Sequence, residues 1–382
     1  MKTHPNFLLQ KIEEDYYLLP FGQAIAEQRR GLHLNETGVF LWNHLEDVSS
    51  AEELACLLAE NYDAAPEELA LLKEDVQAFL DALRDWGILV SDLPVKREPF
   101  AKMLRIAGLS LRLEGDPDLL SASFDAFSVS CGETGSADMT VTVHTARPLA
   151  HQTGEILVHN EQLLVADCGD FFDILFLKNQ SAGELFLAKD GSYARIFCTQ
   201  SDRNTMREEV FHAIRIPFLY LASRHRMAAL HSASVLYEGK AWLFTGRSGI
   251  GKSTHTSHWS TLFETPILNG DLNLIDVSAG EPVVHGIPWC GTSGMFTTAS
   301  HPLGGIVMLH RAPKDYVTES SPAERTLFIN QRLISPSWTR ELFAANMKLT
   351  QALVPSILFA NLHCTANPHA AGVMKEWIDA HR

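Results

Sequence analysis

The sequence predicts a multidomain protein that combines an α+β part with an α/β part. Its 382 residues are 46% hydrophobic, which is enough apolar material for at least two separate cores. Residues 6–34 contain short β-prone runs, and three helical patterns follow them within the first quarter of the chain. In the C-terminal part, β-prone runs and helical patterns alternate, which is typical of a sheet with helices packed against it.

The N-terminal segment, residues 1–92, is predicted to form a small α+β or winged-helix-like domain. Its first helix is expected to begin after Asn35, and its second after Ser50, which starts an S-x-x-E spacing typical of a capping box. The third helix is expected to begin at Pro66 and to stop at Gly87, with apolar residues at helical spacing between them. Strands followed by three helices fit a compact domain of this size.

Three further segments complete the predicted organisation. Residues 93–102 are expected to be a linker, because the stretch around them is polar and contains two prolines. Residues 103–225 are predicted to be a β-rich segment followed by a helix that packs on the C-terminal core, residues 226–382. That helix is expected to begin near Thr205, where "TMRE" has the capping spacing, and to continue to about Ala229.

Charge and composition exclude several classes of function. The formal net charge is -15, and residues 1–95 hold 18 acidic and 6 basic residues, a local net charge of -12. Nucleic-acid binding relies on clustered Lys and Arg, so we expect no nucleic-acid partner. The six cysteines are scattered, and no apolar run is long enough for a secretory signal or a membrane span. We therefore expect a cytoplasmic protein with no membrane partner; homo-oligomer formation is left open.

The stretch "GRSGIGKST" fits the phosphate-binding pattern G-x-x-x-x-G-K-[ST]. A β-prone run, "GKAWLFTG", precedes it and a helical pattern follows, as a phosphate-binding loop requires. Glycines allow backbone N–H groups to approach anionic oxygens, and the lysine adds a positive charge near the β- and γ-phosphates. The residues predicted to bind nucleotide phosphates are Gly246, Arg247, Ser248, Gly249, Ile250, Gly251, Lys252, Ser253 and Thr254. The sequence therefore predicts ATP as a ligand, with Mg²⁺.

A carboxylate near the metal or the attacking hydroxyl is also needed for phosphoryl transfer. Asp271 follows a predicted buried strand at Pro266–Leu268, and a strand end beside the loop strand would place it at the phosphates. Asp271 and Ser253 are therefore the predicted metal ligands, and Asp271 and Lys252 are predicted catalytic residues. The alternative is an ordinary turn residue, because "NGD" is a strong turn signal.

Several other residues have two interpretations. His231, shortly before the loop strand, is either a third catalytic residue or a structural histidine. His255 and His258 could suggest a metal pair, but solvated helix positions are the favoured reading because no third ligand is nearby. Cys290 is interpreted as a packing residue, since phosphate chemistry needs no thiol. Arg311 could meet either a phosphate or a carboxylate.

The stretch "LHSASVLYEGKAWLFTGRSGIGKST", with "ILNGDLNLI" after it, resembles the catalytic domain of the HPr kinase/phosphorylase family. The resemblance covers residues 226–280 most closely. It implies a P-loop kinase core related to phosphoenolpyruvate carboxykinase, which phosphorylates a protein serine with ATP and Mg²⁺. In this resemblance Asp271 matches the second carboxylate of an acidic pair and acts as the base for the acceptor hydroxyl. His231 matches the histidine that precedes the loop strand.

Two residues depart from the pattern of that family. Gly270 stands where the first Asp of the acidic pair is expected, and Thr254 follows the loop where Glu is usual. The missing carboxylate changes the expected metal arrangement and puts a reverse phosphorylase activity in doubt.

The N-terminal segment, over residues 5–92, is similar to the PqqD-like peptide-recognition fold of pathways that modify ribosomally made peptides. The resemblance lies in "LLQKIEEDYYLLPFG", "LHLNETGVFLWNHLE" and the helical patterns after them. It implies that a leader peptide binds as an extra strand at a sheet edge, against a helix. A winged-helix module for DNA binding or dimerisation is the alternative, and the negative charge disfavours DNA.

The two resemblances together predict an ATP-dependent kinase that phosphorylates a hydroxyl, expected to be a serine, of a precursor peptide. Two alternatives remain open. One is a regulatory kinase that acts on a folded carrier protein. The other is a nucleotide-gated peptide chaperone that transfers no phosphate, which the glycine at position 270 makes conceivable.

Overall fold

The computed structural model divides the chain into two compact units. Unit 1 comprises Met1–Arg97 and Thr145–Gly154, and unit 2 comprises Glu98–His144 and Glu155–Arg382. The structure describes residues 1–4, 6–26, 31–48, 50–65, 68–86, 88–90, 98–130, 136–146, 154–199 and 201–381. None of the helices within these ranges is long and apolar enough to cross a membrane.

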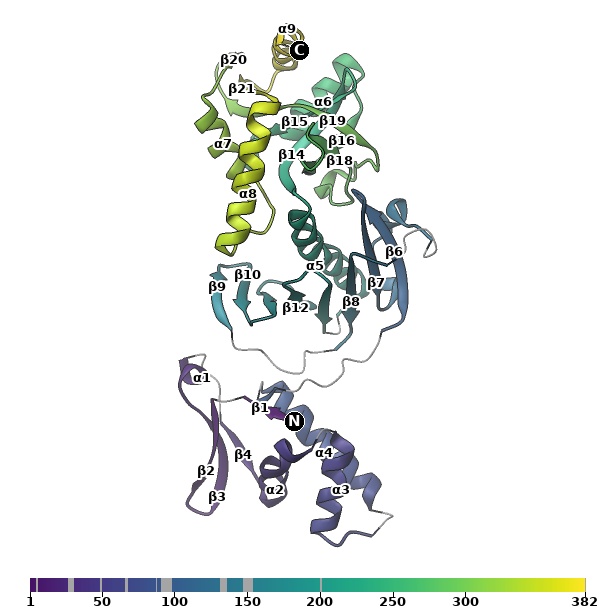
Figure 1. Cartoon of the computed structure of the whole chain (residues 1–382), viewed down its shortest axis with the longest axis vertical. Helices are drawn as coiled ribbons and strands as arrows, with labels where there is room; N and C mark the ends of the chain where they lie inside the picture. Colours follow the sequence, from purple (N-terminus) through teal and green to yellow (C-terminus); the bar gives the residue numbers. More distant parts are fainter. Residues whose placement is uncertain are drawn as a thin grey trace. The chain divides into compact units, whose positions relative to one another are not determined.

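Unit 1 combines a small antiparallel sheet with helices (Figure 1). Its strands are β1 (Lys2–Thr3), β2 (Phe7–Ile12), β3 (Asp15–Pro20), β4 (Leu32–Leu34) and β5 (Leu89–Val90), and its helices are α1 (Gln23–Ala26), α2 (Glu36–His44), α3 (Ala51–Asn61) and α4 (Leu69–Asp85). Strands β2, β3 and β4 form a meander, and β1 pairs with β5. The predicted strands and the three helices after them are confirmed, but Gln23–Ala26, inside the region predicted to hold only short strands, forms helix α1.

The predicted helix starts in unit 1 are confirmed at two of three positions. The Asn35 side chain accepts a hydrogen bond from the Gly38 amide at 2.8 Å, and the Ser50 hydroxyl accepts one from the Glu53 amide at 3.1 Å. Both bonds satisfy N–H groups that a helix leaves without an internal partner. The predicted start and stop of the third helix, at positions 66 and 87, lie outside the described residues.

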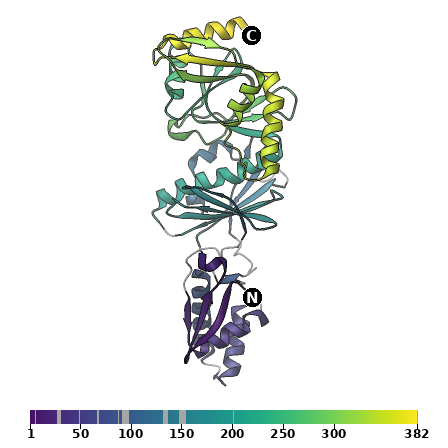
Figure 2. The ribbon, with the colours of Figure 1, turned by 90° about the vertical axis from the view of Figure 1, so that its left-hand side faces the viewer.

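A large sheet and one long helix form the first layers of unit 2. The strands are β6 (Phe100–Ile106), β7 (Leu109–Glu114), β8 (Met139–His144), β9 (Glu155–His159), β10 (Leu163–Asp167), β11 (Phe171–Phe176), β12 (Ala182–Ala188) and β13 (Tyr193–Cys198). They pair in the order β6-β7-β8-β13-β12-β11-β10-β9. Helix α5 (Arg203–Arg224) lies across one face of this sheet in Figure 2. The predicted β-rich segment is confirmed.

Both predicted ends of helix α5 are wrong. Its cap is Asp202, whose carboxylate accepts from the amides of Asn204 at 3.1 Å and Thr205 at 3.0 Å, so the helix begins before the predicted cap. It ends at Arg224 instead of Ala229, because Arg226 adopts a left-handed φ of 61° and strand β14 starts at the next residue.

The predicted linker at residues 93–102 is too long at its C-terminal end. Strand β6 begins at Phe100, and the guanidinium of Arg112 on β7 lies 4.8 Å from the ring centroid of Phe100. This cation–π contact and the pairing with β7 keep residues 100–102 in the sheet. Residues 93–97 of the predicted linker lie outside the described residues.

Four helices pack against the second sheet of unit 2. Its strands are β14 (Met227–Tyr237), β15 (Lys240–Thr245), β16 (Ile267–Asn269), β17 (Leu272–Asp276), β18 (Val283–His285), β19 (Ser300–Arg311), β20 (Tyr316–Thr318) and β21 (Leu358–Cys364), and the helices are α6 (Lys252–Phe263), α7 (Pro322–Asn330), α8 (Arg340–Leu353) and α9 (His369–His381). Strands β15, β19 and β21 are parallel neighbours, and the hairpin partner of β15 is β14.

Two apolar clusters flank this second sheet. One contains Ile329 and Leu349 from α7 and α8, and the other contains Trp259 and Met374 from α6 and α9. The predicted sheet with helices packed against it is confirmed, and the two clusters show that the helices cover opposite faces.

The two sheets of unit 2 share one core. A single apolar cluster includes Leu185 on β12, Phe218 on α5, Leu274 on β17 and Trp289 in the loop after β18. The predicted division between residues 225 and 226 therefore lies inside a compact unit, with α5 packed between the sheets.

Candidate active site

A glycine loop, residues 246–251, joins strand β15 to helix α6. Gly251 precedes the helix and has a φ of 110°, a conformation that side chains with a Cβ rarely adopt. Lys252 is the first residue of α6, so the N-terminal end of the helix directly follows the loop. This strand, loop and helix arrangement is the one that the sequence predicted, and it can receive an anion.

His231 and Asp271 form a hydrogen-bonded pair beside the loop. The His231 Nε2 atom lies 3.1 Å from Asp271 Oδ1, with exposed side-chain fractions of 30% and 38%. His231 lies on β14, and the amide of the next residue, Ser232, donates to the Asp271 carbonyl at 2.9 Å. The hydrogen bond from His231 is the largest cause that lowers the pKa of the Asp271 carboxyl, while its partial burial acts in the opposite direction. Asp271 is therefore a carboxylate at neutral pH.

The strand before Asp271 does not lie beside the loop strand, although the sequence predicted that it would. The strand before it, β16, pairs with β14 and not directly with the loop strand β15. The buried Asn269 side chain builds the bend after β16: its Oδ1 accepts from the amides of Asp271 at 3.0 Å and Leu272 at 3.1 Å. The turn signal "NGD" and the site role of Asp271 are thus compatible.

Lys252 lies within electrostatic range of Asp271. Burial lowers the pKa of the half-buried Lys252 ammonium, the negative charge of Asp271 raises it, and the positive charge of Arg332 lowers it. The charge of Lys252 also lowers the pKa of Asp271. The structure thus brings the three predicted catalytic residues, Lys252, Asp271 and His231, into one site.

Two arginines of the site were not identified from the sequence. Arg215 on α5 lies close enough to Asp271 for its charge to lower the pKa of that carboxyl, and burial lowers the pKa of the Arg215 guanidinium. Arg332 follows α7, and its carbonyl accepts from the His231 amide at 3.0 Å. A basic residue within the apolar run "HAIRIPFLYL" was a local signal for Arg215, whereas Arg332 had none.

A loop at residues 287–294 packs against the Asp271 side chain at Gly291 and is anchored to α5. The Trp289 Nε1 atom donates to the carbonyl of Phe211 at 2.9 Å, and the Trp289 ring lies 5.1 Å from that of Phe218. Phe211, Arg215 and Phe218 share one stripe of the helix because four and three residues separate them. The Trp289 anchor therefore holds this loop over Asp271 on the same side as Arg215. Cys290 is buried and burial raises the pKa of its thiol, in line with the packing role.

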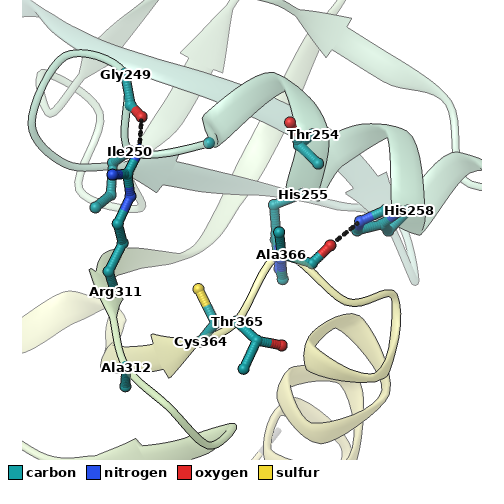
Figure 3. Close-up of a pocket in the computed structure, with 11 residues that line it drawn as sticks. Gly249, Ile250, Thr254, His255, His258, Arg311, Ala312, Cys364, Thr365 and Ala366 are labelled. Carbon is teal, nitrogen blue, oxygen red and sulfur yellow. Dashed lines mark hydrogen bonds between the residues drawn. The ribbon is translucent and has the colours of Figure 1, made fainter.

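A cavity of about 440 Å³ opens beside the glycine loop on the α6 side (Figure 3). Its walls are Gly249, Ile250, Gly251, Thr254, His255, His258, Arg311, Ala312, Cys364, Thr365 and Ala366. The Arg311 Nη2 atom donates to the Gly249 carbonyl at 2.7 Å, so Arg311 holds the loop itself (Figure 3). His258 Nε2 donates to the Ala366 carbonyl at 3.2 Å and closes the opposite wall.

His255 is a core residue and not a solvated helix position. It is 4% exposed, and the Trp259 Nε1 atom donates to its Nε2 at 3.1 Å. Burial lowers the pKa of His255 to about 3, so the ring is neutral. No group of three or more His, Cys, Asp or Glu side chains that could hold a metal ion occurs among the described residues. Trp259, one helical turn later, contributes to the burial of His255, and the sequence pattern did not reveal this contact.

Gly270 is required by the loop that covers the site. A Cβ atom at this position would lie 2.1 Å from Ser293 Oγ and 2.6 Å from Ser293 Cβ. Both distances are far shorter than ordinary van der Waals contact, so no carboxylate fits here in the observed arrangement. The departure from the expected acidic pair therefore has a local structural cause.

We expect Gly270→Asp to destabilise unit 2 by about 1–3 kcal/mol through overpacking against Ser293. Thermal or urea unfolding of the full chain measures the loss. Gly270→Asp combined with Ser293→Gly is the matched control, because it removes both close atoms, and it should recover most of the stability. Equal destabilisation of the single and double variants would contradict this explanation.

Comparison with known proteins identifies a domain in unit 1. Residues 25–89 match the family model described as "Coenzyme PQQ synthesis protein D (PqqD)". The chain is thus a mixed α/β multidomain protein with a PqqD domain near its N-terminus, which confirms the resemblance inferred for that segment.

Among solved structures, this chain is similar to "Structure of the Hpr(Ser) kinase/phosphatase from Coxiella burnetii", with 8% sequence identity and a TM-score of 0.25, over 40% of this chain and 90% of that chain. A TM-score of this size does not establish a common fold. No curated protein matches the sequence.

Proposed function

We propose that this protein is a peptide kinase: unit 2 transfers the γ-phosphoryl group of ATP to a hydroxyl of a ribosomally made precursor peptide, whose leader is captured by the PqqD domain. The observation that carries the proposal is the His231–Asp271 pair at 3.1 Å, within electrostatic range of Lys252 at the start of the helix after the glycine loop. Phosphoryl transfer needs this combination of a phosphate-binding loop, a cation and a carboxylate.

The nucleotide would bind with its phosphates on the glycine loop and its nucleoside in the cavity beside Thr254 and His258. The ammonium of Lys252 and the loop amides would stabilise the negative charge of the phosphates. Ser253 and Asp271 fit as Mg²⁺ ligands, because Mg²⁺ binds through a few hard oxygens and keeps several waters. When bound, Mg²⁺ neutralises charge on the β- and γ-phosphates.

Asp271 would position the acceptor hydroxyl. The hydroxyl oxygen attacks the γ-phosphorus, the bond to the bridging oxygen breaks, and ADP leaves with the electron pair. The acceptor proton passes to the Asp271 carboxylate, whose orientation the hydrogen bond from His231 fixes. Because the pKa of Asp271 is lowered, the proton transfer is expected late, once the attacking oxygen has become acidic.

The PqqD domain supports the peptide as the substrate. Its sheet has β2 and β4 as edge strands, and β4 lies beside α2. A leader peptide could add to β4 as a further strand, with α2 against its side chains. Binding of the leader would then raise the effective concentration of the acceptor at the kinase site, without new contacts to the acceptor itself.

The test is incubation of the full-length protein with a precursor peptide encoded beside its gene, ATP and Mg²⁺, followed by mass spectrometry. We expect a gain of one phosphate on the peptide, and a rate at low peptide concentration about 100-fold lower when the leader is removed. A folded carrier protein serves as the competing substrate. Nucleotide-dependent peptide binding without any phosphopeptide would instead favour the chaperone alternative.

A further inference from the structure

A cleft rich in arginine opens on the α7 side of the glycine loop. We call it the arginine cleft; its volume is about 570 Å³, and its lining includes Arg247, Gly249, Arg311, Phe328, Gln331 and Arg332. Three of these described lining residues are arginines and none is Asp or Glu. Such a lining favours an anionic occupant, and the glycine loop forms one of its walls.

Arg332 has a fixed position in this cleft. Its carbonyl accepts from the amide of His231 at 3.0 Å, and Leu230 and Leu333 form an antiparallel bridge beside this bond. The chain after α7 is thereby attached to β14 next to the His231–Asp271 pair. Arg332 therefore enters the cleft from the side of the predicted catalytic residues.

The guanidinium of Arg332 has hydrogen-bonding capacity that the described residues do not use. Its Nε atom is buried without a hydrogen-bond partner among them, and its Nη1 atom lies 3.5 Å from the Gln331 carbonyl, a long contact. A buried, unpaired N–H is costly, and the cost is higher for a charged group. Arg311, by contrast, already donates to the Gly249 carbonyl.

Arg332 and Lys252 are two cations beside the glycine loop. Arg332 lines the cleft of which this loop forms a wall, and Lys252 directly follows the loop, so their like charges repel. The nearby carboxylate, Asp271, is hydrogen-bonded to His231. An anion between the two cations would relieve the repulsion and give Arg332 Nε a partner.

We propose that Arg332 is a further catalytic residue, which binds a non-bridging oxygen of the transferred γ-phosphoryl group. The assignment rests on the proposed function in taking the nucleoside triphosphate as the donor. During transfer, the bond from the γ-phosphorus to ADP breaks while the bond to the acceptor oxygen forms, and Arg332 stabilises the charge on the oxygens between them. An arginine supplied by the same chain performs this role in some phosphate-transferring enzymes.

The first test needs no peptide. The affinities of the full-length protein for ADP and for a non-hydrolysable ATP analogue, each with Mg²⁺, are measured by calorimetry. Arg332→Gln should weaken binding of the analogue about tenfold and change binding of ADP less than twofold, because only the analogue has a γ-phosphate. Equal weakening of both ligands, or of neither, would overturn the assignment.

Arg325→Gln is the matched control on α7. The Arg325 Nε atom donates to the Ser320 carbonyl at 2.8 Å, and Arg325 does not line the arginine cleft. Arg325→Gln should therefore keep the wild-type preference for the ATP analogue over ADP. Arg332→Lys, which keeps the charge and loses the planar fork, provides a second measurement if Arg332→Gln does not fold, and should show a smaller loss than Arg332→Gln.

The second test uses the peptide. Arg332→Gln should lower kcat by about 10³-fold, and added guanidinium ion should restore part of the rate, which a purely structural role would not allow. An unchanged kcat would contradict the proposal. If the wild type transfers no phosphate at all, the proposed function fails, and the ADP and analogue affinities still decide whether Arg332 contacts a γ-phosphate.

Discussion

Asp271→Asn is expected to lower kcat for peptide phosphorylation by on the order of 10³-fold and to leave nucleotide affinity within about threefold of the wild type. Asparagine keeps the size of the side chain but cannot accept the acceptor proton. Steady-state kinetics with the precursor peptide and calorimetry with ADP separate the two effects. Lys252→Ala should differ by losing nucleotide affinity as well as rate, because its charge acts on the phosphates themselves.

The second sheet offers a matched control for this experiment. Asp276 Oδ2 lies 3.3 Å from His285 Nε2, so β17 and β18 carry another histidine–aspartate pair, and neither residue lines the cavities beside the glycine loop. Asp276→Asn should leave kcat unchanged within about twofold. A loss as large as that of Asp271→Asn would show that the effect is structural.

The pair at Asp271 also has a pH signature. Its pKa is lowered chiefly by the hydrogen bond from His231, so the carboxylate form persists to unusually low pH. His231→Gln weakens that cause, the pKa of Asp271 rises, and the acid limb of the kcat profile should move to higher pH. A profile that falls in height without moving along the pH axis would mean that His231 does not act through Asp271.

Asp173→Asn is expected to stabilise the protein by at least about 2 kcal/mol at pH 8. Asp173 on β11 and Glu184 on β12 share one face of the first sheet, and each is 3% exposed. Burial, with the nearby Glu184, raises the pKa of Asp173 from 3.8 to about 9. Between these values the folded protein holds a proton that the unfolded chain releases, so stability should fall as pH rises from about 4 to about 9.

Asparagine should remove this dependence, because its amide can donate to Glu184 without binding a proton. Urea unfolding of the full chain at pH 5 and pH 8 measures it: the advantage of Asp173→Asn should grow as the pH rises. Asp170→Asn, at an exposed position just before β11, is the control and should change stability by less than about 0.5 kcal/mol at either pH. A gain independent of pH would contradict the assignment of the proton to this pair.

Local sequence signals predicted those parts of the fold that depend on neighbouring residues. Asn35 and Ser50 cap the helices that follow them, and the glycine loop joins a strand to a helix, because each feature is a bond or dihedral within a few residues. Asp202 was missed although it is also local, since a Thr three residues later offered the same capping pattern. When two nearby residues both fit a capping pattern, only the structure of the complete helix shows which one is the cap.

The site residues that the sequence did not identify are distant in the chain. Arg215 approaches Asp271 from a helix that packs between two sheets, and Arg332 is placed by pairing with β14. Ser293 excludes a carboxylate at position 270 through a loop returning from the next strands. None of these three contacts leaves a periodic or capping pattern in the sequence, because each depends on how separate elements pack. His231 and Asp271 were predictable because they flank a recognisable loop.

The anchor of Trp289 on α5 has a consequence for how this protein can be divided or altered. The Trp289 Nε1 atom donates to the Phe211 carbonyl, so the segment beside Asp271 is attached to a helix outside the second sheet. A catalytic fragment cut at residue 226 would lose that fastening and leave Trp289 without its aromatic neighbours. A fragment that keeps this anchor must therefore include α5 and the first sheet, from Phe100 onward.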